Sequence, residues 1–192
     1  MELYDKMKLQ ENLFQYCRGI DRMDAEQIRS TYWPESTDDH GFFHGPGAEW
    51  PEAGVEWKDN LYNCNHHVTN VLIELKGTQA QRESMFMVCS NMKNPEITYF
   101  LGGRYRDLCE KREGAWKILR RVCVWDWFEH YPTSGGWELT TFPTMSNWGA
   151  FHPHDPIYGD WTKSEHTMFP RPGDQLIAHH LNAKATANNG KN

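Results

Sequence analysis

The chain has 192 residues, a net charge of −6 and a pI near 5.9, with 39% hydrophobic and 24% charged residues. This length allows one domain with a sizeable core and is too short for two ordinary ones. An acidic chain without a basic face is not expected to bind nucleic acid. No apolar run is long enough to span a bilayer, and the N-terminus lacks the apolar core of a signal peptide, so we expect a cytoplasmic protein with no membrane partner.

The first part of the chain predicts helices. Apolar residues recur at helical spacing over about residues 5–18, which predicts the first helix. Asp24 is a suitable N-cap for a second helix, with Gln27 at the capping-box position, and Pro34 is expected to end that segment. A weaker third helix is predicted over about residues 47–61.

Four strands are predicted next, at His66–Lys76, Arg82–Cys89, Ile97–Arg112 and Ala115–Phe128. Alternation in the first of them places Val68, Asn70, Leu72 and Glu74 on one face and Thr69, Val71, Ile73 and Leu75 on the other. Helices followed by a strand meander indicate an α+β fold with helices packed on one face of an antiparallel sheet.

Beyond Pro132 the periodicity ends. We therefore divide the chain into a domain at residues 1–131 and an irregular arm, rich in aromatic residues and proline, at residues 132–192, whose last residues are expected to be disordered. The arm contains Trp137, Phe142, Trp148, Phe151 and Trp161. So apolar a segment is expected to lie against the domain or a neighbouring subunit.

The five cysteines are scattered, odd in number and without a Cys-x-x-Cys pair, which indicates reduced thiols. Possible metal ligands are His152-Pro153-His154-Asp155, His179-His180, and His40 and His44 near Asp38 and Asp39. A metal site requires three or four convergent ligands with supporting contacts, and the pattern supplies no such set. We therefore predict neither a metal nor another cofactor.

Several side chains suit acid–base chemistry. Tyr16 and Asp21 lie at the end of the first predicted helix, His66 opens the first long strand, and Arg121 lies in the last one. A histidine held by a carboxylate is a general base in a fixed tautomer, a tyrosine hydroxyl donates to a leaving group, and an arginine stabilises an anion. Each of these residues also has a plain packing interpretation, and the sequence alone does not bring the four together.

The segments YCRGID, HHVTNVLIEL and YFLGGRYRDLCEKREGAWKILRRVCVWDW make residues 3–128 resemble the SnoaL-like group of the nuclear transport factor 2 superfamily. That group includes scytalone dehydratase, γ-hexachlorocyclohexane dehydrochlorinase and bile acid 7α-dehydratase. The resemblance implies a curved, cone-shaped antiparallel sheet, an α+β barrel, whose N-terminal helices close a hydrophobic cavity.

The resemblance also implies roles for individual residues. The aspartate that closes the first helix of those lyases corresponds to Asp21, and the tyrosine five positions before it to Tyr16. The catalytic histidine precedes an x-x-Thr-Asn run, which selects His66 over His67; in a strand the latter faces the opposite side. An active-site arginine of the dehydrochlorinase corresponds to Arg121.

Further residues are assigned to substrate binding. The resemblance implies that an arginine of the bile acid enzyme corresponds to a position near Trp125 instead of Arg121. A pocket tyrosine of scytalone dehydratase has His40 as its nearest match. Asp38 or Asp39 is expected to enter the cavity together with His40. The predicted substrate-binding residues are His40, Arg121, Arg104, Asn70, Trp125 and Asp39.

Together these features predict a cofactor-independent lyase that performs β-elimination on an aromatic or polycyclic small molecule. His66, polarised by Asp21, removes a proton; Tyr16, with His40, protonates or orients the departing hydroxyl. Loss of water is the default, while loss of halide, or release of formaldehyde by a retro-aldol step, uses the same Asp-His dyad. The group resemblance also implies a homotrimer or homodimer formed through the open sheet face.

Two other classes of function stay open from the sequence. One is a non-catalytic protein, either a ligand-binding module or a structural subunit like the β subunit of ring-hydroxylating dioxygenases, which predicts a cavity without the dyad. The other is a polyketide cyclase or isomerase, which transfers protons without losing a group.

Overall fold

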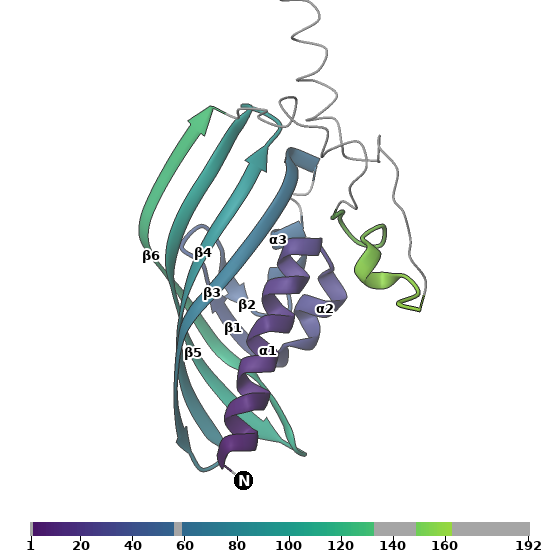
Figure 1. Ribbon diagram of the computed structural model, residues 1–192. Helices are drawn as coiled ribbons and strands as arrows, with labels where there is room; N and C mark the ends of the chain where they lie inside the picture. Colours follow the sequence, from purple (N-terminus) through teal and green to yellow (C-terminus); the bar gives the residue numbers. More distant parts are fainter. Residues whose placement is uncertain (1, 56–58, 133–148, 163–192) are drawn as a thin grey trace, which may run out of the picture.

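The computed structural model describes residues 2–55, 59–132 and 149–162 (Figure 1). Its elements are α1 (Glu2–Arg22), α2 (Ala25–Ser30), β1 (Tyr32–Asp39), β2 (His44–Pro46), α3 (Trp50–Val55), β3 (Leu61–Lys76), β4 (Gln79–Met92), β5 (Ile97–Arg112), β6 (Ala115–Pro132) and the short 3-10 helix η4 (Pro156–Tyr158). None of the helices in these residues is long and apolar enough to cross a membrane.

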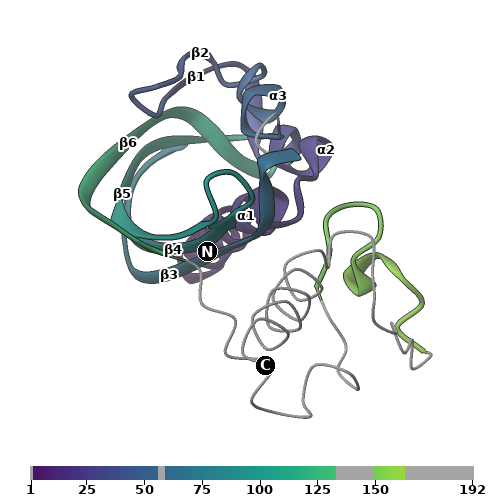
Figure 2. The same ribbon diagram turned by 90° about the horizontal axis from the view of Figure 1, so that it is seen from above.

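A six-stranded sheet in the order β2-β1-β6-β5-β4-β3 curls around α1, which lies on its concave side (Figures 1 and 2). The predicted α+β cone is thereby confirmed. The sheet is not wholly antiparallel, however, because β1 pairs in parallel with β6. After α2 the chain enters β1, which pairs with the edge of β6 and runs in the same direction. A sequence of strands joined by short turns predicts pairing between consecutive strands only, so it does not reveal this parallel pair.

The helices follow their local chemistry. Asp24 caps α2 as predicted, its Oδ1 accepting from the N–H of Gln27 at 3.0 Å. Pro34 does not end this helix: α2 ends at Ser30, and Pro34 lies within β1. The third helix, Trp50–Val55, is shorter than predicted. α1 extends beyond the predicted range and buries one face, which includes Leu9, Leu13, Tyr16, Cys17 and Ile20.

A bulge in β3 decides which of its side chains face inward. The pairing of β3 with β4 shifts between Val68 and Val71. His66 and Val68 lie on the concave side before the shift, and Val71, Ile73 and Leu75 pack against the core after it. One inserted residue thus moves the inward-facing set from even to odd positions, which a strict period of two does not anticipate.

The register between β5 and β6 also shifts, at Gly102 and Gly103. A Cβ on Gly103 would lie 2.2 Å from the carbonyl oxygen of Val124 and 2.8 Å from the ring of Phe86. A Cβ on Gly102 would lie 2.6 Å from the Trp127 indole. The two strands therefore approach each other closely at a position that excludes any side chain.

Part of the C-terminal arm contacts the end of α1. Asp155 forms an ion pair with Arg22 at 3.1 Å, the N–H of His152 donates to the carbonyl of Arg22 at 2.6 Å, and the Tyr158 hydroxyl donates to Asp24 at 2.9 Å. Residues 149–162 thus lie against the domain, as expected for the arm. The predicted disordered tail falls outside the described residues.

Candidate active site

A cavity of about 310 Å³ opens on the concave side of the sheet, and its walls are mostly apolar. Its lining residues come from α1, α3, β3 to β6 and the loop after β1: Tyr16, Ile20, Met23, His40, Phe42, Trp50, Gly54, Leu61, Cys64, His66, Val88, Ser90, Met92, Tyr99, Leu101, Tyr105, Trp125 and Phe128. The principal acid–base groups among them are the imidazoles of His40 and His66 and the hydroxyl of Tyr16. Such a cavity suits a small apolar or aromatic ligand that a few polar groups orient.

Asp21 and His66 meet at this cavity, although 45 residues separate them in the chain. Asp21 Oδ1 lies 2.6 Å from Nδ1 of His66, and both carboxylate oxygens lie 2.9 Å from the backbone N–H of His66. The carboxylate therefore binds the ring and the backbone of one residue at once. The ring cannot rotate without losing a short bond, so its Nδ1 carries the proton that Asp21 accepts.

The remaining nitrogen of that ring, Nε2, has no hydrogen-bond partner among the described residues, and His66 lines the cavity. Burial lowers the pKa of the His66 imidazole, but the Asp21 carboxylate and the nearby Cys64 raise it by more, so the net pKa lies well above that of an ordinary histidine. His67 is exposed, as strand alternation predicts for the neighbour of an inward-facing residue.

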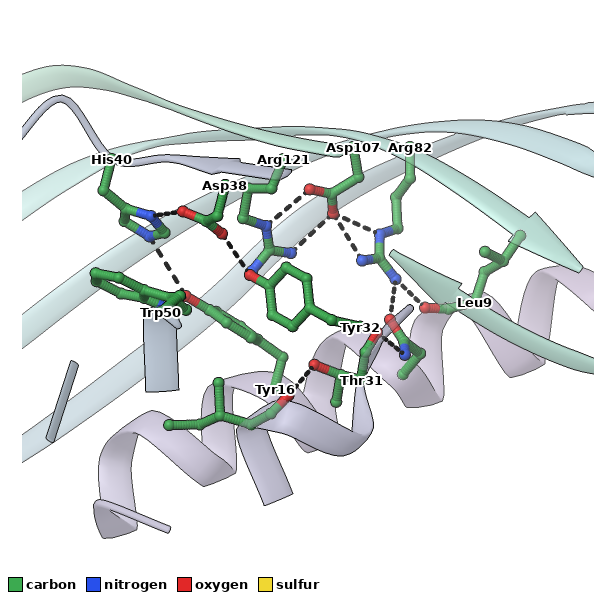
Figure 3. Close-up of polar contacts among 12 residues, drawn as sticks. Leu9, Tyr16, Thr31, Tyr32, Asp38, His40, Trp50, Arg82, Asp107 and Arg121 are labelled. Atoms are coloured by element: carbon green, nitrogen blue, oxygen red, sulfur yellow. Dashed lines mark hydrogen bonds and ion pairs between the residues drawn. The ribbon is translucent and has the colours of Figure 1, made fainter. Parts of the chain in front are cut away.

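His40, which lines the same cavity, forms a second histidine–carboxylate pair with Asp38 behind it (Figure 3). Nδ1 of His40 is bonded to Oδ1 of Asp38, whose Oδ2 accepts from the Tyr32 hydroxyl at 2.6 Å. On its other side, Nε2 of His40 lies 3.3 Å from the Tyr16 hydroxyl. That hydroxyl also accepts from Trp50 Nε1 at 3.0 Å.

Arg121 lies beneath the cavity and does not line it. It is fully buried and bound to Asp107 through two hydrogen bonds of 2.7 and 2.8 Å, and Arg82 binds the same carboxylate (Figure 3). Its guanidinium carbon lies 3.9 Å from the centre of the Tyr16 ring and 4.1 Å from that of Tyr105. The predicted contact of Arg121 with substrate is thus replaced by a cation–π contact with Tyr16.

Three other predicted binding residues lie away from the cavity. Arg104 is part-exposed and paired with Asp126, because Tyr105 takes the inward position of the β5 pleat. Asn70 is exposed and bonded to Met85, since the β3 bulge turns it outward. Asp39 is part-exposed and contacts Gly41 and His44. Trp125, by contrast, lines the cavity and donates to the carbonyl of His40 at 3.0 Å.

The sequence predicts that Asp38 or Asp39 accompanies His40 and assigns substrate binding to Asp39, whereas the structure places Asp38 against His40. Asp38 is 1% exposed and faces inward, while Asp39 faces outward. The alternation of a strand indicates this choice, because Asp38 and His40 are two residues apart and share a face. Tyr32 and Trp50 complete the contacts of this second pair, and nothing in their local sequence marks them.

One group among the described residues has the composition of a metal site: ligand atoms of Asp21, Cys64 and His66 lie within 4.8 Å of one another. The 2.6 Å separation of Asp21 Oδ1 and His66 Nδ1 is that of a direct hydrogen bond, which leaves no space for an ion between them. Cys64 Sγ lies 3.8 Å from the same nitrogen. The arrangement fits a hydrogen-bonded dyad better than a metal centre.

The geometry supports proton transfer at two places in one apolar cavity. His66 offers a free nitrogen backed by a carboxylate, which is the arrangement of a general base. Burial raises the pKa of the Tyr16 hydroxyl far above its ordinary value, although the Arg121 cation opposes this, so Tyr16 keeps its proton. A proton acceptor and a proton donor thus line the same space.

The comparisons with known proteins identify the family and the fold. Residues 1–122 match the family model of a SnoaL-like domain. None of the curated proteins gives a significant match.

Among solved structures, a candidate scytalone dehydratase from Novosphingobium aromaticivorans DSM 12444 is 19% identical, with a TM-score of 0.63 over 70% of this chain and 92% of that one. Hexachlorocyclohexane dehydrochlorinase LinA-type3 from Novosphingobium barchaimii LL02 is 17% identical, with a TM-score of 0.62 over 70% of this chain and 93% of the other. A protein of unknown function from Mycobacterium tuberculosis is 20% identical, with a TM-score of 0.58 over 65% and 77%. At these identities the likeness is one of fold.

Proposed function

The chain belongs to the SnoaL-like domain family, and we propose that it is a cofactor-independent lyase that performs β-elimination on an aromatic or polycyclic small molecule. The observation that carries this proposal is the Asp21–His66 pair, whose free ring nitrogen belongs to a residue lining an apolar cavity. Support comes from two structural neighbours whose names, a candidate scytalone dehydratase and a hexachlorocyclohexane dehydrochlorinase, denote eliminations.

In the proposed reaction, Nε2 of His66 removes a proton from a carbon next to a carbonyl or an activated ring. Asp21 keeps the other nitrogen protonated and stabilises the imidazolium that forms. The C–H electron pair becomes the second bond of an alkene, and the leaving group departs from the adjacent carbon with its own electron pair. Loss of water is the default outcome.

The aromatic lining supports an aromatic or polycyclic substrate. Tyr99 and Phe128 line the cavity as a ring pair with centroids 5.0 Å apart. Phe42, Trp50 and Trp125 line it near His40. A flat ring among such side chains gains apolar contact area and edge-to-face or stacked geometry.

The proposal is tested by incubating the protein with a panel of hydroxylated diaryl compounds and β-hydroxy ketones and identifying the products by liquid chromatography and mass spectrometry. We expect an alkene product whose formation His66→Ala lowers by ~10²- to 10⁴-fold, the range of a general base. Arg104→Ala, on the outer face of the sheet, is the matched control and keeps wild-type rates. Equal product formation by the wild type and His66→Ala refutes the assignment of His66.

A further inference from the structure

We propose that Tyr16, His40 and Asp38 form a second proton-transfer unit that protonates the leaving group, so that the site favours substrates that lose water over matched substrates that lose halide. This inference rests on the proposed elimination at His66 and specifies the class of leaving group. It is carried by a continuous set of contacts that runs from the cavity wall into the buried interior (Figure 3).

The contacts link four side chains in succession. Tyr16 and His40 line the cavity, Asp38 lies behind His40, and Tyr32 lies behind Asp38. His40 is 4% and Asp38 1% exposed. A carboxylate buried this deeply requires donors, and it has two: the Tyr32 hydroxyl and Nδ1 of His40.

The hydrogen bonds of the Tyr16 oxygen determine where its hydroxyl proton points. The Tyr16 oxygen already accepts from Trp50 Nε1 at 3.0 Å. When Nε2 of His40 carries a proton, the oxygen accepts a second bond across the 3.3 Å contact, and both its acceptor positions are filled. The hydroxyl proton then has no partner among the described residues, and Tyr16 lines the cavity in which a leaving group would lie.

The unit is held rigidly. The His40 ring is stacked on the Trp50 indole, with 3.9 Å between centroids and 12° between planes, and the backbone carbonyl of His40 accepts from Trp125 Nε1 at 3.0 Å. The Arg121 cation over the Tyr16 ring stabilises negative charge that develops on the phenol oxygen. The donor is thus fixed before substrate binds, which lowers the entropic cost of the proton transfer.

In the proposed step, proton transfers at His66 and Tyr16 accompany the loss of water. His66 Nε2 takes the proton from carbon, the carbon–carbon double bond forms, and the carbon–oxygen bond breaks toward oxygen. Tyr16 gives its hydroxyl proton to that oxygen, which leaves as water, and His40 Nε2 gives its proton to the Tyr16 oxygen. The substrate becomes alkene and water, with no oxidant or reductant. The proton on His66 returns to His40 through solvent to reset the site.

Leaving groups differ in their need for this unit. Hydroxide is a strong base and leaves readily only when it is protonated, whereas chloride is the anion of a strong acid and leaves without a proton. General acid catalysis therefore accelerates the loss of water and has little to contribute to the loss of chloride.

The test uses two probes with one carbon skeleton, 4-hydroxy-4-phenylbutan-2-one and 4-chloro-4-phenylbutan-2-one, which both yield 4-phenylbut-3-en-2-one. We expect His40→Gln and Tyr16→Phe to lower kcat/KM for the hydroxy probe by at least ~10²-fold more than for the chloro probe, the usual scale of general acid catalysis. His66→Gln lowers both. Equal losses on the two probes, or no loss on the hydroxy probe, overturn the second unit.

A second measurement keeps the inference separate from the proposed function, because it requires no turnover. In protein labelled with ¹⁵N-histidine, NMR is expected to show protons on both ring nitrogens of His40, with a low-field Nδ1–H resonance that Asp38→Asn abolishes while the fold is retained. An unprotonated Nε2 on His40 overturns the inference. If the wild type eliminates neither probe, the proposed function fails on these probes, while the NMR result still decides the protonation of His40.

Discussion

The two histidine–carboxylate pairs each contribute their histidine to one cavity but are built in different ways. Asp21 and His66 are 45 residues apart and join the end of α1 to β3, whereas Asp38 and His40 are neighbours on one face of β1 and its continuation. The first pair leaves a ring nitrogen free, and the second has both nitrogens engaged. A free nitrogen suits a base, and an engaged one suits a relay, so the difference in partners separates the two proposed roles.

The largest expected effect separates the two rings by the step each performs. With 4-phenylbutan-2-one, which has no leaving group, we expect the wild type and His40→Gln to exchange the protons next to the carbonyl with deuterated solvent. His66→Gln is expected to slow this exchange by ~10³-fold, because only His66 removes the carbon-bound proton. Exchange is measured by NMR or mass spectrometry. Loss of exchange in His40→Gln would merge the two roles into one.

A smaller effect is expected when the carboxylate behind the base is removed. Asp21→Asn lowers kcat/KM for elimination by ~10²-fold, because the ring loses the acceptor that fixes its tautomer and stabilises its charged form. The amide oxygen still accepts one of the His66 N–H groups, so the fold is retained. Steady-state kinetics on the hydroxy probe, with circular dichroism as a control for folding, measure this effect; rates like those of the wild type would contradict it.

The pH profile provides a third test. A base acts only when it is unprotonated, and the net pKa of His66 is raised, chiefly by Asp21 against the effect of burial. The rate is therefore expected to rise with pH through a limb above ~6.5, the ordinary histidine value. In Asp21→Asn the limb moves to lower pH. The other titratable groups at the His66 ring are Cys64 and Cys17. A limb that does not move in the variant places the titration on another group.

The smallest effect is expected at Arg104. Its pairing with Asp126 lies on the outer face of the sheet and is part-exposed, and such pairs contribute ~0–1 kcal/mol to stability. Arg104→Ala is expected to change kcat/KM by less than ~2-fold, since the side chain does not reach the cavity. Kinetics on the hydroxy probe and thermal unfolding measure both quantities. A large loss of activity would support the predicted role of Arg104 in substrate binding.

Local features of the sequence predicted much of the fold. The capping of α2 by Asp24 and the strand Ile97–Arg112 were predicted correctly, because a cap and a long alternating run depend on neighbouring residues. The parallel pairing of β1 with β6 was not, since it joins residues far apart in the chain. The prediction that Asp21 and His66 form a pair came from family resemblance and not from periodicity.

The site residues that were placed wrongly have two physical causes, a bulge at Asn70 and side-chain packing at Arg121. Asn70 lies within the bulge between Val68 and Val71, which no residue type in the sequence indicates, so a strict alternation fails there. Arg121 does face inward, as its β6 position requires, but it lies where Asp107 and two aromatic rings fill the space. Facing the interior of a cone and lining its cavity are different conditions, and only packing in three dimensions distinguishes them.

Gly103 has a consequence for the wall of the cavity. Phe86 is stacked on Tyr105 and lies in ring contact with His66 and Trp125, so its position affects three lining residues at once. Phe86 occupies that position because residue 103 has no side chain. A methyl group added there would lie 2.2 Å from the Val124 carbonyl oxygen and 2.8 Å from the Phe86 ring, so either the pairing of β5 with β6 or the phenyl ring would have to move. The wall behind His66, Tyr105 and Trp125 therefore depends on a side chain that residue 103 does not have.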